Sequence, residues 1–135
     1  MTVFLCLDAN NGMRFNGRRQ SRDRGQRADM LRLAGARRIY MRGEAAKLFL
    51  SLPVNVVPTE DFSRVPAEAC AFVERAEDLS CLRPEEVVIY RWGCCYPADE
   101  FLPCAYLAGY VLVDRTEITG SSHEKISVEV YRCDG

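Results

Sequence analysis

Arginines gather near the start of the chain, at a spacing that could bind an anion. Nine of them lie between Arg14 and Arg38, where the only acids are Asp23 and Asp29. A planar guanidinium donates two parallel hydrogen bonds, so clustered arginines suit phosphate or carboxylate groups. The alternative is that they pair with acids of residues 48–135, where fifteen acidic residues face seven basic ones. The arginines predicted to hold a ligand are Arg18, Arg19, Arg22 and Arg24.

Other charged and aromatic residues could contribute to the same site. Arg42 and Gly43 precede a predicted helix, whose free N–H groups would favour an anion; a simple strand-to-helix turn is the alternative. Asp8 follows the first predicted strand, where clefts of α/β sheets open, but an aspartate there also forms turns. The other cleft candidates, at the end of a predicted central strand, are Tyr90, Arg91 and Trp92. Core packing is the alternative for Trp92.

The histidine and cysteine content argues against a metal site. His123 is the one histidine, and with Glu124 and Lys125 it could form a general-base cluster or have a structural role. The cysteines are odd in number and form no C-x-x-C pair, which argues against a complete disulfide framework and against zinc. We expect most of them to be small buried residues in a reduced compartment. They are Cys6, Cys70, Cys81, Cys94, Cys95, Cys104 and Cys133.

Length and composition indicate an ordinary globular chain. Its 135 residues suit one domain spanning 1–135, and 48% hydrophobic with 27% charged residues excludes wholesale disorder and collagen-like repeats. The apolar runs are too short for a membrane span. The apolar start, residues 1–8, is too short for a secretory signal and ends in an acid. We therefore expect a soluble, cytoplasmic protein with no membrane partner.

The pattern of apolar runs and turn residues predicts strands that alternate with helices early in the chain and follow one another late. Helices are predicted over 23–34, 44–50 and, as a short turn, 76–82. Residues 8–21 are predicted to turn, and 93–103 to be irregular. Strands are predicted over 2–7, 38–41, 54–57, 71–73, 86–90, 110–114 and 126–131. The fold class expected is α/β, a mixed β-sheet with flanking helices.

The order of these elements, with the residues in the turns, resembles dihydrofolate reductase. Residues 11–18 read NGMRFNGR, and the chain continues without a gap to IYMRG at 39–43. Residues 96–103 (YPADEFLP) are similar to the segment before the family's closing strands, and residues 122–132 to its last strand. The resemblance covers roughly 2–57 and 86–132 and depends on the order of motifs that are individually common. It implies a single-domain dihydrofolate reductase-like fold and, in the family, an NADPH cofactor.

Two departures from the family put the reductase activity in doubt. The ungapped register places Gln26 at the general acid of the family, and an amide cannot deliver a proton. The alternative acids, Asp23 and Asp29, each lie three residues away, about one helical turn. The glycine pair that approaches the cofactor phosphates would follow residues 88–89, where the sequence reads YRW. Side chains of that size would block a close approach of the backbone.

The function expected is therefore binding of an anionic nucleotide or phosphorylated small molecule, without a cofactor and without reductase activity. The alternative is a divergent NADPH-dependent reductase that uses Asp23 or Asp29. A third reading is RNA binding or processing, which positive charge would support. Short bacterial chains like this one can carry a ribonuclease Z label. However, one histidine cannot supply that family's two metal sites, and only Phe15 offers a stacking ring within the arginine run.

Overall fold

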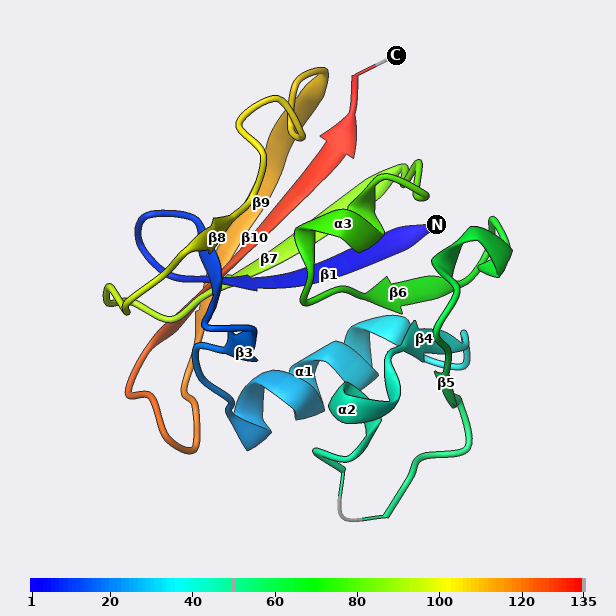
Figure 1. Cartoon of the computed structure of the whole chain (residues 1–135), viewed down its shortest axis with the longest axis horizontal. Coiled ribbons are helices and arrows are strands. Elements are labelled where there is room, and N and C mark those ends of the chain that lie inside the picture. Colours follow the sequence, from blue (N-terminus) through cyan, green and yellow to red (C-terminus); the bar gives the residue numbers. More distant parts are fainter. Residues whose placement is uncertain (50, 135) are drawn as a thin grey trace.

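The computed structural model describes residues 1–49 and 51–134. Its main element is one mixed β-sheet of seven strands. Its first five strands in spatial order are parallel, and the last two run antiparallel to their neighbours (Figure 1). In that order the strands are β5 (Val56–Pro58), β4 (Ile39–Met41), β6 (Cys70–Phe72), β1 (Thr2–Leu7), β7 (Glu86–Arg91), β10 (Ile126–Cys133) and β9 (Tyr110–Ile118). The α/β class with a mixed sheet, predicted from the sequence, is confirmed.

A second, three-stranded sheet forms where the sequence predicted only turns and irregular chain. It contains β3 (Arg18–Arg19), β2 (Gly12–Phe15) and β8 (Glu100–Phe101). Asn16 and Gly17 connect β2 to β3 with φ angles of 52° and 70°. Positive φ at both positions matches the twist of a tight hairpin, so the Asn-Gly step closes a hairpin and does not simply end a strand. This hairpin carries the first arginines of the cluster.

Helix α1 (Arg24–Ala34) is the longest helix and matches the predicted range. The Asp23 side chain accepts hydrogen bonds from the N–H groups of Gly25 and Gln26, which satisfies free donors of the first turn. Gly35, with φ 61°, ends the helix in the left-handed region that favours glycine. Met30 and Ala34, four residues apart on one face of the helix, are buried against the sheet. The helix predicted over 23–34 is therefore confirmed, with Asp23 as its N-cap and not as its first helical residue.

The other helices are shorter than predicted. Where the sequence predicted a helix over 44–50, the structure has α2 (Gly43–Ala46). After α2, the N–H groups of Leu48 and Phe49 donate to carbonyls three residues earlier, which is the hydrogen-bond pattern of a 3₁₀ turn. The predicted last residue of this helix, Leu50, lies outside the described residues. The helical turn predicted over 76–82 is α3 (Ala76–Leu79). One further turn of 3₁₀-helix, η1 (Phe62–Arg64), lies between β5 and β6.

Strand β9 extends four residues beyond its predicted end at Asp114. The added segment, RTEI, is too polar to suggest a strand, but it continues the pairing with β10 as far as Ile118 opposite Ile126. Backbone pairing with a neighbour therefore sets its length. Strand β5 begins at Val56, two residues later than predicted, and it includes Pro58 at the sheet edge, where a missing N–H is tolerated.

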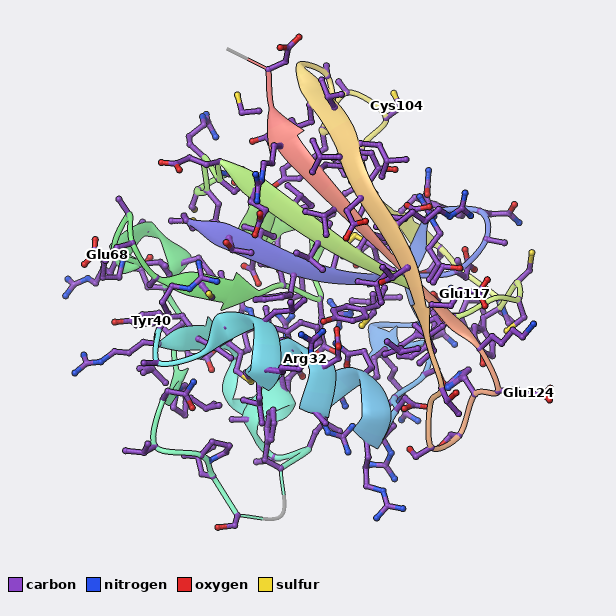
Figure 2. All side chains as sticks on the ribbon, turned by 180° about the vertical axis from the view of Figure 1, so that it is seen from behind. Arg32, Tyr40, Glu68, Cys104, Glu117 and Glu124 are labelled. Carbon is purple, nitrogen blue, oxygen red and sulfur yellow. The ribbon has the colours of Figure 1, made fainter. Side chains whose placement is uncertain are left out.

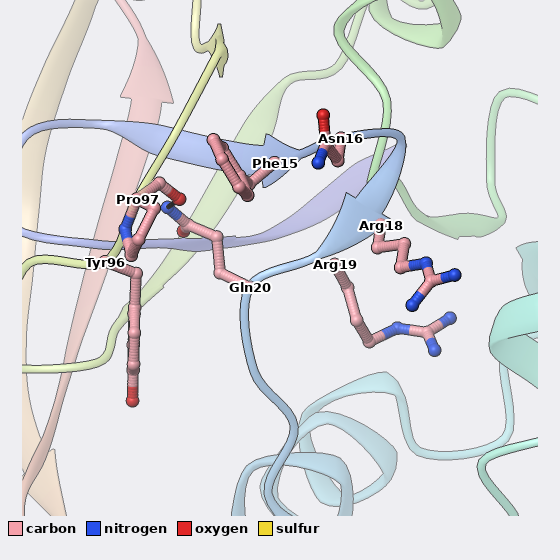
Figure 3. A pocket seen from close by; sticks show the side chains of 7 residues that line it. All are labelled: Phe15, Asn16, Arg18, Arg19, Gln20, Tyr96 and Pro97. Carbon is pink, nitrogen blue, oxygen red and sulfur yellow. Dashed lines mark hydrogen bonds between the residues drawn. The ribbon is translucent and has the colours of Figure 1, made fainter.

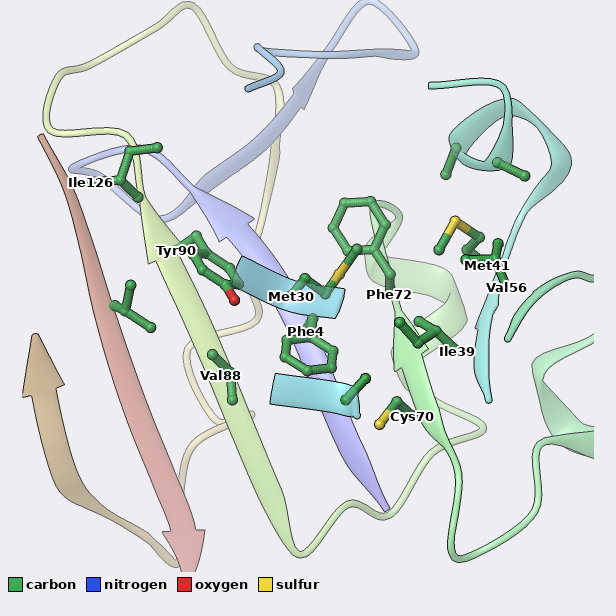
Figure 4. Close-up of a cluster of buried hydrophobic side chains, with 14 of the residues drawn as sticks. Phe4, Met30, Ile39, Met41, Val56, Cys70, Phe72, Val88, Tyr90 and Ile126 are labelled. Atoms are coloured by element: carbon green, nitrogen blue, oxygen red, sulfur yellow. The ribbon is translucent and has the colours of Figure 1, made fainter. Parts of the chain in front are cut away.

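Apolar side chains on the two faces of β1 form two separate cores. Phe4 points into one core with Met30 of α1, Phe72 of β6 and Tyr90 of β7 (Figure 4). Alternate residues of β1, beginning with Val3, point into the other core, which α3 covers. Figure 2 views the molecule from behind, with Arg32 labelled on α1. Both faces of the parallel strands are thus covered, which explains why they read as continuous apolar runs.

The prediction that most cysteines are buried is wrong. Cys70 is buried and Cys6 is half-buried, while the other five are exposed because they lie in loops, in turns or at the end of β10. All seven are free thiols. Burial of Cys6 raises the pKa of its thiol, which disfavours the reactive thiolate. Among the described residues, no helix is long and apolar enough to cross a membrane.

Candidate anion-binding site

The arginine-rich hairpin separates two adjoining cavities. The first, of about 540 Å³, is called the hairpin hollow and has Tyr96 and Pro97 on one side and arginines of β3 on the other (Figure 3). Its lining residues are Phe15, Asn16, Arg18, Arg19, Gln20, Tyr96 and Pro97. The second, of about 570 Å³, is called the arginine hollow. It is lined by Arg14, Gly17, Arg18, Arg19, Ser21, Arg22, Glu44 and Glu74.

A third cavity lies across the start of α1 from the arginine hollow. This basic groove, of about 380 Å³, combines positive side chains with two serines and one carboxylate, Asp23. Its lining residues are Arg22, Asp23, Arg24, Arg27, Lys47, Leu48, Ser121 and Ser122. Arg22 lines both this groove and the arginine hollow, so it lies at the boundary between them. Three of the four arginines predicted to hold a ligand line the arginine hollow, and the fourth, Arg24, lines the groove.

Ion pairing divides the predicted arginines into two groups. Arg19 is held by Glu74 at 2.7 Å and donates to the backbone carbonyl of Glu44, so it stabilises the wall of the hollow. Within residues 1–49 and 51–134, Arg18, Arg22 and Arg24 form no salt bridge. All three are exposed. Arg19 therefore pairs with an acid of the second part of the chain, as the alternative interpretation predicted. The guanidiniums of Arg18, Arg22 and Arg24 are accessible to a ligand.

Arg27 shows that positive charge accumulates at the start of α1. Its Nη1 atom is buried and has no hydrogen-bond partner among the described residues, although the guanidinium lies 5.9 Å from the centre of the Phe49 ring. Burial, and next the positive charge of Arg22, lower the pKa of Arg27 from its ordinary value. A buried donor without a partner costs about 1–3 kcal/mol. An anion at this place would relieve both the repulsion and the missing hydrogen bond.

The predicted anion seat at Arg42 and Gly43 is not supported by the geometry. The Arg42 guanidinium donates to both carboxylate oxygens of Asp78 at 2.8 Å and to Glu60 at 2.9 Å. The bond to Asp78 raises the pKa of Arg42. Helix α2 has only four residues, too few for a substantial dipole. The side chain therefore closes an internal ion pair, which the sequence could not reveal because Asp78 lies 36 residues away.

Asp8 and Arg91 organise loops and do not face an open cleft. The buried Asp8 carboxylate accepts from the N–H groups of Asn10, Gly12 and Tyr96 and from the Gln20 amide, at 2.8–3.1 Å. Asp8 therefore stabilises a turn, which was the alternative to a role in a cleft. Arg91 donates to Glu129 at 2.9 Å and to the Asn11 side chain at 2.7 Å. Both side chains join the end of the central strands to the 8–12 turn.

Tyr90 and Trp92 lie in the core. Tyr90 is fully buried, and its hydroxyl donates to Asp29 at 2.9 Å. Trp92 is 4% exposed and stacks on His123, with ring centroids 4.6 Å apart. The expectation that they line an accessible cleft is therefore corrected in favour of core packing, because both side chains point into the core that also contains Phe4 and Met30. Trp92 also lines a cavity of about 20 Å³ between α1 and the sheet, called the narrow recess. Its lining residues are Cys6, Arg19, Ser21, Arg22, Gln26, Arg27, Leu48, Phe72, Val73, Glu74 and Trp92.

His123 does not form a general-base cluster with Glu124 and Lys125, one of the two roles considered for it. Both of those side chains are exposed, and Glu124 extends away from the molecule (Figure 2). Instead, the two imidazole nitrogens contact residues far away in the sequence. Nδ1 lies 3.0 Å from Asp23 Oδ2, while Nε2 lies 3.1 Å from Ser21 Oγ and 3.0 Å from the Tyr96 hydroxyl. Sequence reasoning missed this contact set because Ser21 and Asp23 lie about 100 residues before His123, and Tyr96 lies 27 residues before it.

Asp23 and Asp29, the two carboxylates considered as general acids of a reductase, both form hydrogen bonds within the protein. Asp23 is buried and accepts backbone hydrogen bonds from α1 and from the 121–123 loop. Burial alone would raise the pKa of Asp23, but these bonds outweigh it and hold the pKa well below its ordinary value. Asp29 contacts the Tyr90 hydroxyl and Arg32. Gln26, at the family's acid position, is buried and lines the narrow recess.

Stability should fall in acid because of Asp23 and Asp8, whose pKa values are both lowered by hydrogen-bond donors in the folded state. An unfolded aspartate titrates near pH 3.9, so below about pH 5 the unfolded chain binds more protons than the folded chain. We expect the urea midpoint to be constant above about pH 5 and to decrease from pH 5 to pH 3. An Asp23→Asn variant should show a smaller decrease. Equal midpoints at pH 6 and pH 3 for the unmodified chain would contradict this assignment.

The described part of the chain contains no group of three or more histidine, cysteine, aspartate or glutamate side chains that could hold a metal ion. No model of a known protein family matches this chain, and no curated protein matches it in sequence.

Proposed function

We propose that this chain has a dihydrofolate reductase-like fold and binds an anionic nucleotide or phosphorylated small molecule at the arginine hollow. The fold proposal is supported by the order of elements on which the resemblance depends. The chain runs from β1 through the 11–18 turns to α1, β4 and α2, and it ends in the antiparallel pair β9 and β10. Because fold alone does not determine function, the binding proposal depends on the arginines.

One observation carries the binding proposal: the two cavities on either side of the start of α1 share Arg22, which forms no salt bridge within the described part of the chain. Arg18 enlarges this positive surface on the hairpin side. On the helix side it is enlarged by Arg27, whose Nη1 atom has no hydrogen-bond partner among the described residues. A phosphate group would gain charge-assisted hydrogen bonds from this set, each worth about 1.5–3 kcal/mol. Phe15, 44% exposed beside Arg18, provides a ring on which a nucleotide base could stack.

The alternative, a reductase that uses Asp23 or Asp29, is less well supported. A general acid at neutral pH needs a raised pKa and an open path to substrate, whereas the pKa of Asp23 is lowered and its carboxylate is surrounded by N–H donors. Asp29 lies between Tyr90 and Arg32 and lines none of the cavities described above. The ligand proposal therefore does not depend on hydride transfer.

Binding can be tested by thermal unfolding in the presence of ATP, NADPH, folate and a short single-stranded RNA. We expect ATP or NADPH to raise the melting temperature, because a ligand at ten times its Kd stabilises the folded state by about 1.4 kcal/mol. The Arg18→Ala, Arg22→Ala double variant should bind at least about tenfold more weakly, since it loses two charged donors.

The matched control replaces two arginines away from the cavities, Arg64→Ala with Arg83→Ala, and should bind ATP like the unmodified chain. A melting temperature that none of the phosphate compounds changes would contradict the proposal. A change with RNA alone, which disappears steeply as salt is added, would favour the RNA reading instead.

A further inference from the structure

Ser21, His123 and Asp23 form a hydrogen-bonded line at the edge of the arginine hollow. Ser21 Oγ lies 3.1 Å from His123 Nε2, and His123 Nδ1 lies 3.0 Å from Asp23 Oδ2. This is the order of contacts by which a carboxylate orients an imidazole and the imidazole activates a hydroxyl. The three residues come from the segment before α1 and from the β9–β10 loop, which pack together at this point.

Each member of the line is held in place. The Asp23 side chain has no solvent exposure and is fixed by N–H groups of α1 and of the 121–123 loop. The His123 side chain is 9% exposed, and its ring is stacked on Trp92. A base whose position is set by packing and by a second group is preorganised for proton transfer. Asp23 and His123 thus already have the arrangement that a nucleophilic serine requires.

The contacts of the imidazole determine where its proton lies. The Asp23 carboxylate can only accept at Nδ1, so the neutral ring carries its proton there and presents a lone pair at Nε2. Two hydroxyls face that lone pair, Ser21 Oγ and the Tyr96 hydroxyl at 3.0 Å. Ser21 lines both the arginine hollow and the narrow recess, whereas Tyr96 lines the hairpin hollow only. Ser21 is therefore the hydroxyl that a ligand in the arginine hollow would contact.

The narrow recess beside Ser21 contains hydrogen-bond donors without partners. Gln26 Nε2 and Arg27 Nη1 are buried, line this recess, and have no acceptor within the described residues. The recess has a volume of about 20 Å³, enough for a group the size of one oxygen atom or water. Unpartnered donors beside a nucleophile could stabilise the negative oxygen that develops during acyl transfer.

We propose that Ser21 is a catalytic nucleophile for carboxylic esters that carry a negatively charged group. Ser21 Oγ attacks the carbonyl carbon while its proton passes to His123 Nε2. The carbon–oxygen bond to the alcohol then breaks, and the alcohol leaves with that proton. Water next attacks the acyl-serine, gives one proton to His123, and releases the acid as the proton returns to Ser21. Arg22, which lines the same hollow and recess, would bind the charged group of the ester.

A fluorophosphonate probe tests the nucleophile directly, since its reaction forms a serine–phosphorus bond and releases fluoride. We expect one label per chain, on the peptide that contains Ser21. Ser21→Ala should lose the label, whereas Ser80→Ala, at an exposed serine outside the site, should keep it. No label, or a label on Tyr96 or another serine, would overturn the proposal. Unchanged melting temperatures of both variants would show that lost labelling is not a loss of folding.

Turnover is tested with 4-nitrophenyl hemisuccinate, which carries a carboxylate, and with neutral 4-nitrophenyl acetate. Ser21→Ala should lower the rate by about 100-fold or more for both esters. Arg22→Ala should raise KM for the charged ester by a larger factor than for the acetate. Equal rates for Ser21→Ala and the unmodified chain would overturn the proposal. The fluorophosphonate and acetate reactions need no anionic ligand, so their results stand apart from the proposed nucleotide binding.

Discussion

Replacing Asp23 with alanine is expected to lower the free energy of unfolding by about 3–5 kcal/mol. Loss of a helix cap alone costs about 1 kcal/mol. The Asp23 carboxylate also accepts three N–H groups from the β9–β10 loop, and it orients His123, 100 residues away. Each donor left unsatisfied by the substitution adds about 1–3 kcal/mol where water cannot replace the acceptor. For a chain of this size the melting temperature should fall by about 10–20 °C.

Asp61 provides the matched control for this prediction. It caps η1 through the same side-chain contact, to Ser63 N–H at 3.0 Å, but its side chain is 55% exposed and its bonds are local. Asp61→Ala should therefore cost only about 1 kcal/mol. Urea unfolding of both variants measures the difference. If Asp23→Ala and Asp61→Ala cost the same, Asp23 is a helix cap and does not connect α1 to the β9–β10 loop.

Local features of the sequence were enough to predict α1 and most strands. The apolar spacing up to Ala34 and the glycine that follows it act within a few residues, so the helix and its C-terminal end could be derived from the sequence. The long-range role of Asp23 could not be, because Ser121 and Ser122 have no sequence pattern that indicates a contact with it. The polar end of β9 was missed for the same reason, since its pairing partner is another strand.

The arginine cluster was visible in the sequence, but the state of each arginine was not. Arg19 and Arg42 find buried or half-buried acids, Glu74 and Asp78, more than 30 residues later in the chain. Arg18 and Arg22 lie within three residues of Arg19 in sequence, yet both are exposed and line the arginine hollow. Charge counting predicts that some arginines pair and some do not. Only the tertiary arrangement decides which.

Asp78→Ala is expected to destabilise the protein by about 2–4 kcal/mol, because it removes one partner from a largely buried ion pair. Asp78 is 9% exposed at its side chain, and Arg42 is 19% exposed. The substitution would leave Arg42 Nε and Nη2 without their acceptors at the junction of β4 and α2. The contact joins that junction to α3, so urea unfolding should report a lower midpoint.

Glu60→Ala is the matched control, because it removes the exposed ion-pair partner of the same arginine. Glu60 is 74% exposed and contacts Arg42 through Nη1, so its loss should cost at most about 1 kcal/mol because solvent screens exposed pairs. Similar costs for Asp78→Ala and Glu60→Ala would show that burial does not strengthen the pair. Arg42 would then be weakly held, and the anion seat that the sequence indicated at Arg42 and Gly43 would regain support. A large difference between the two variants instead assigns Arg42 to the framework and leaves ligand recognition to Arg18 and Arg22.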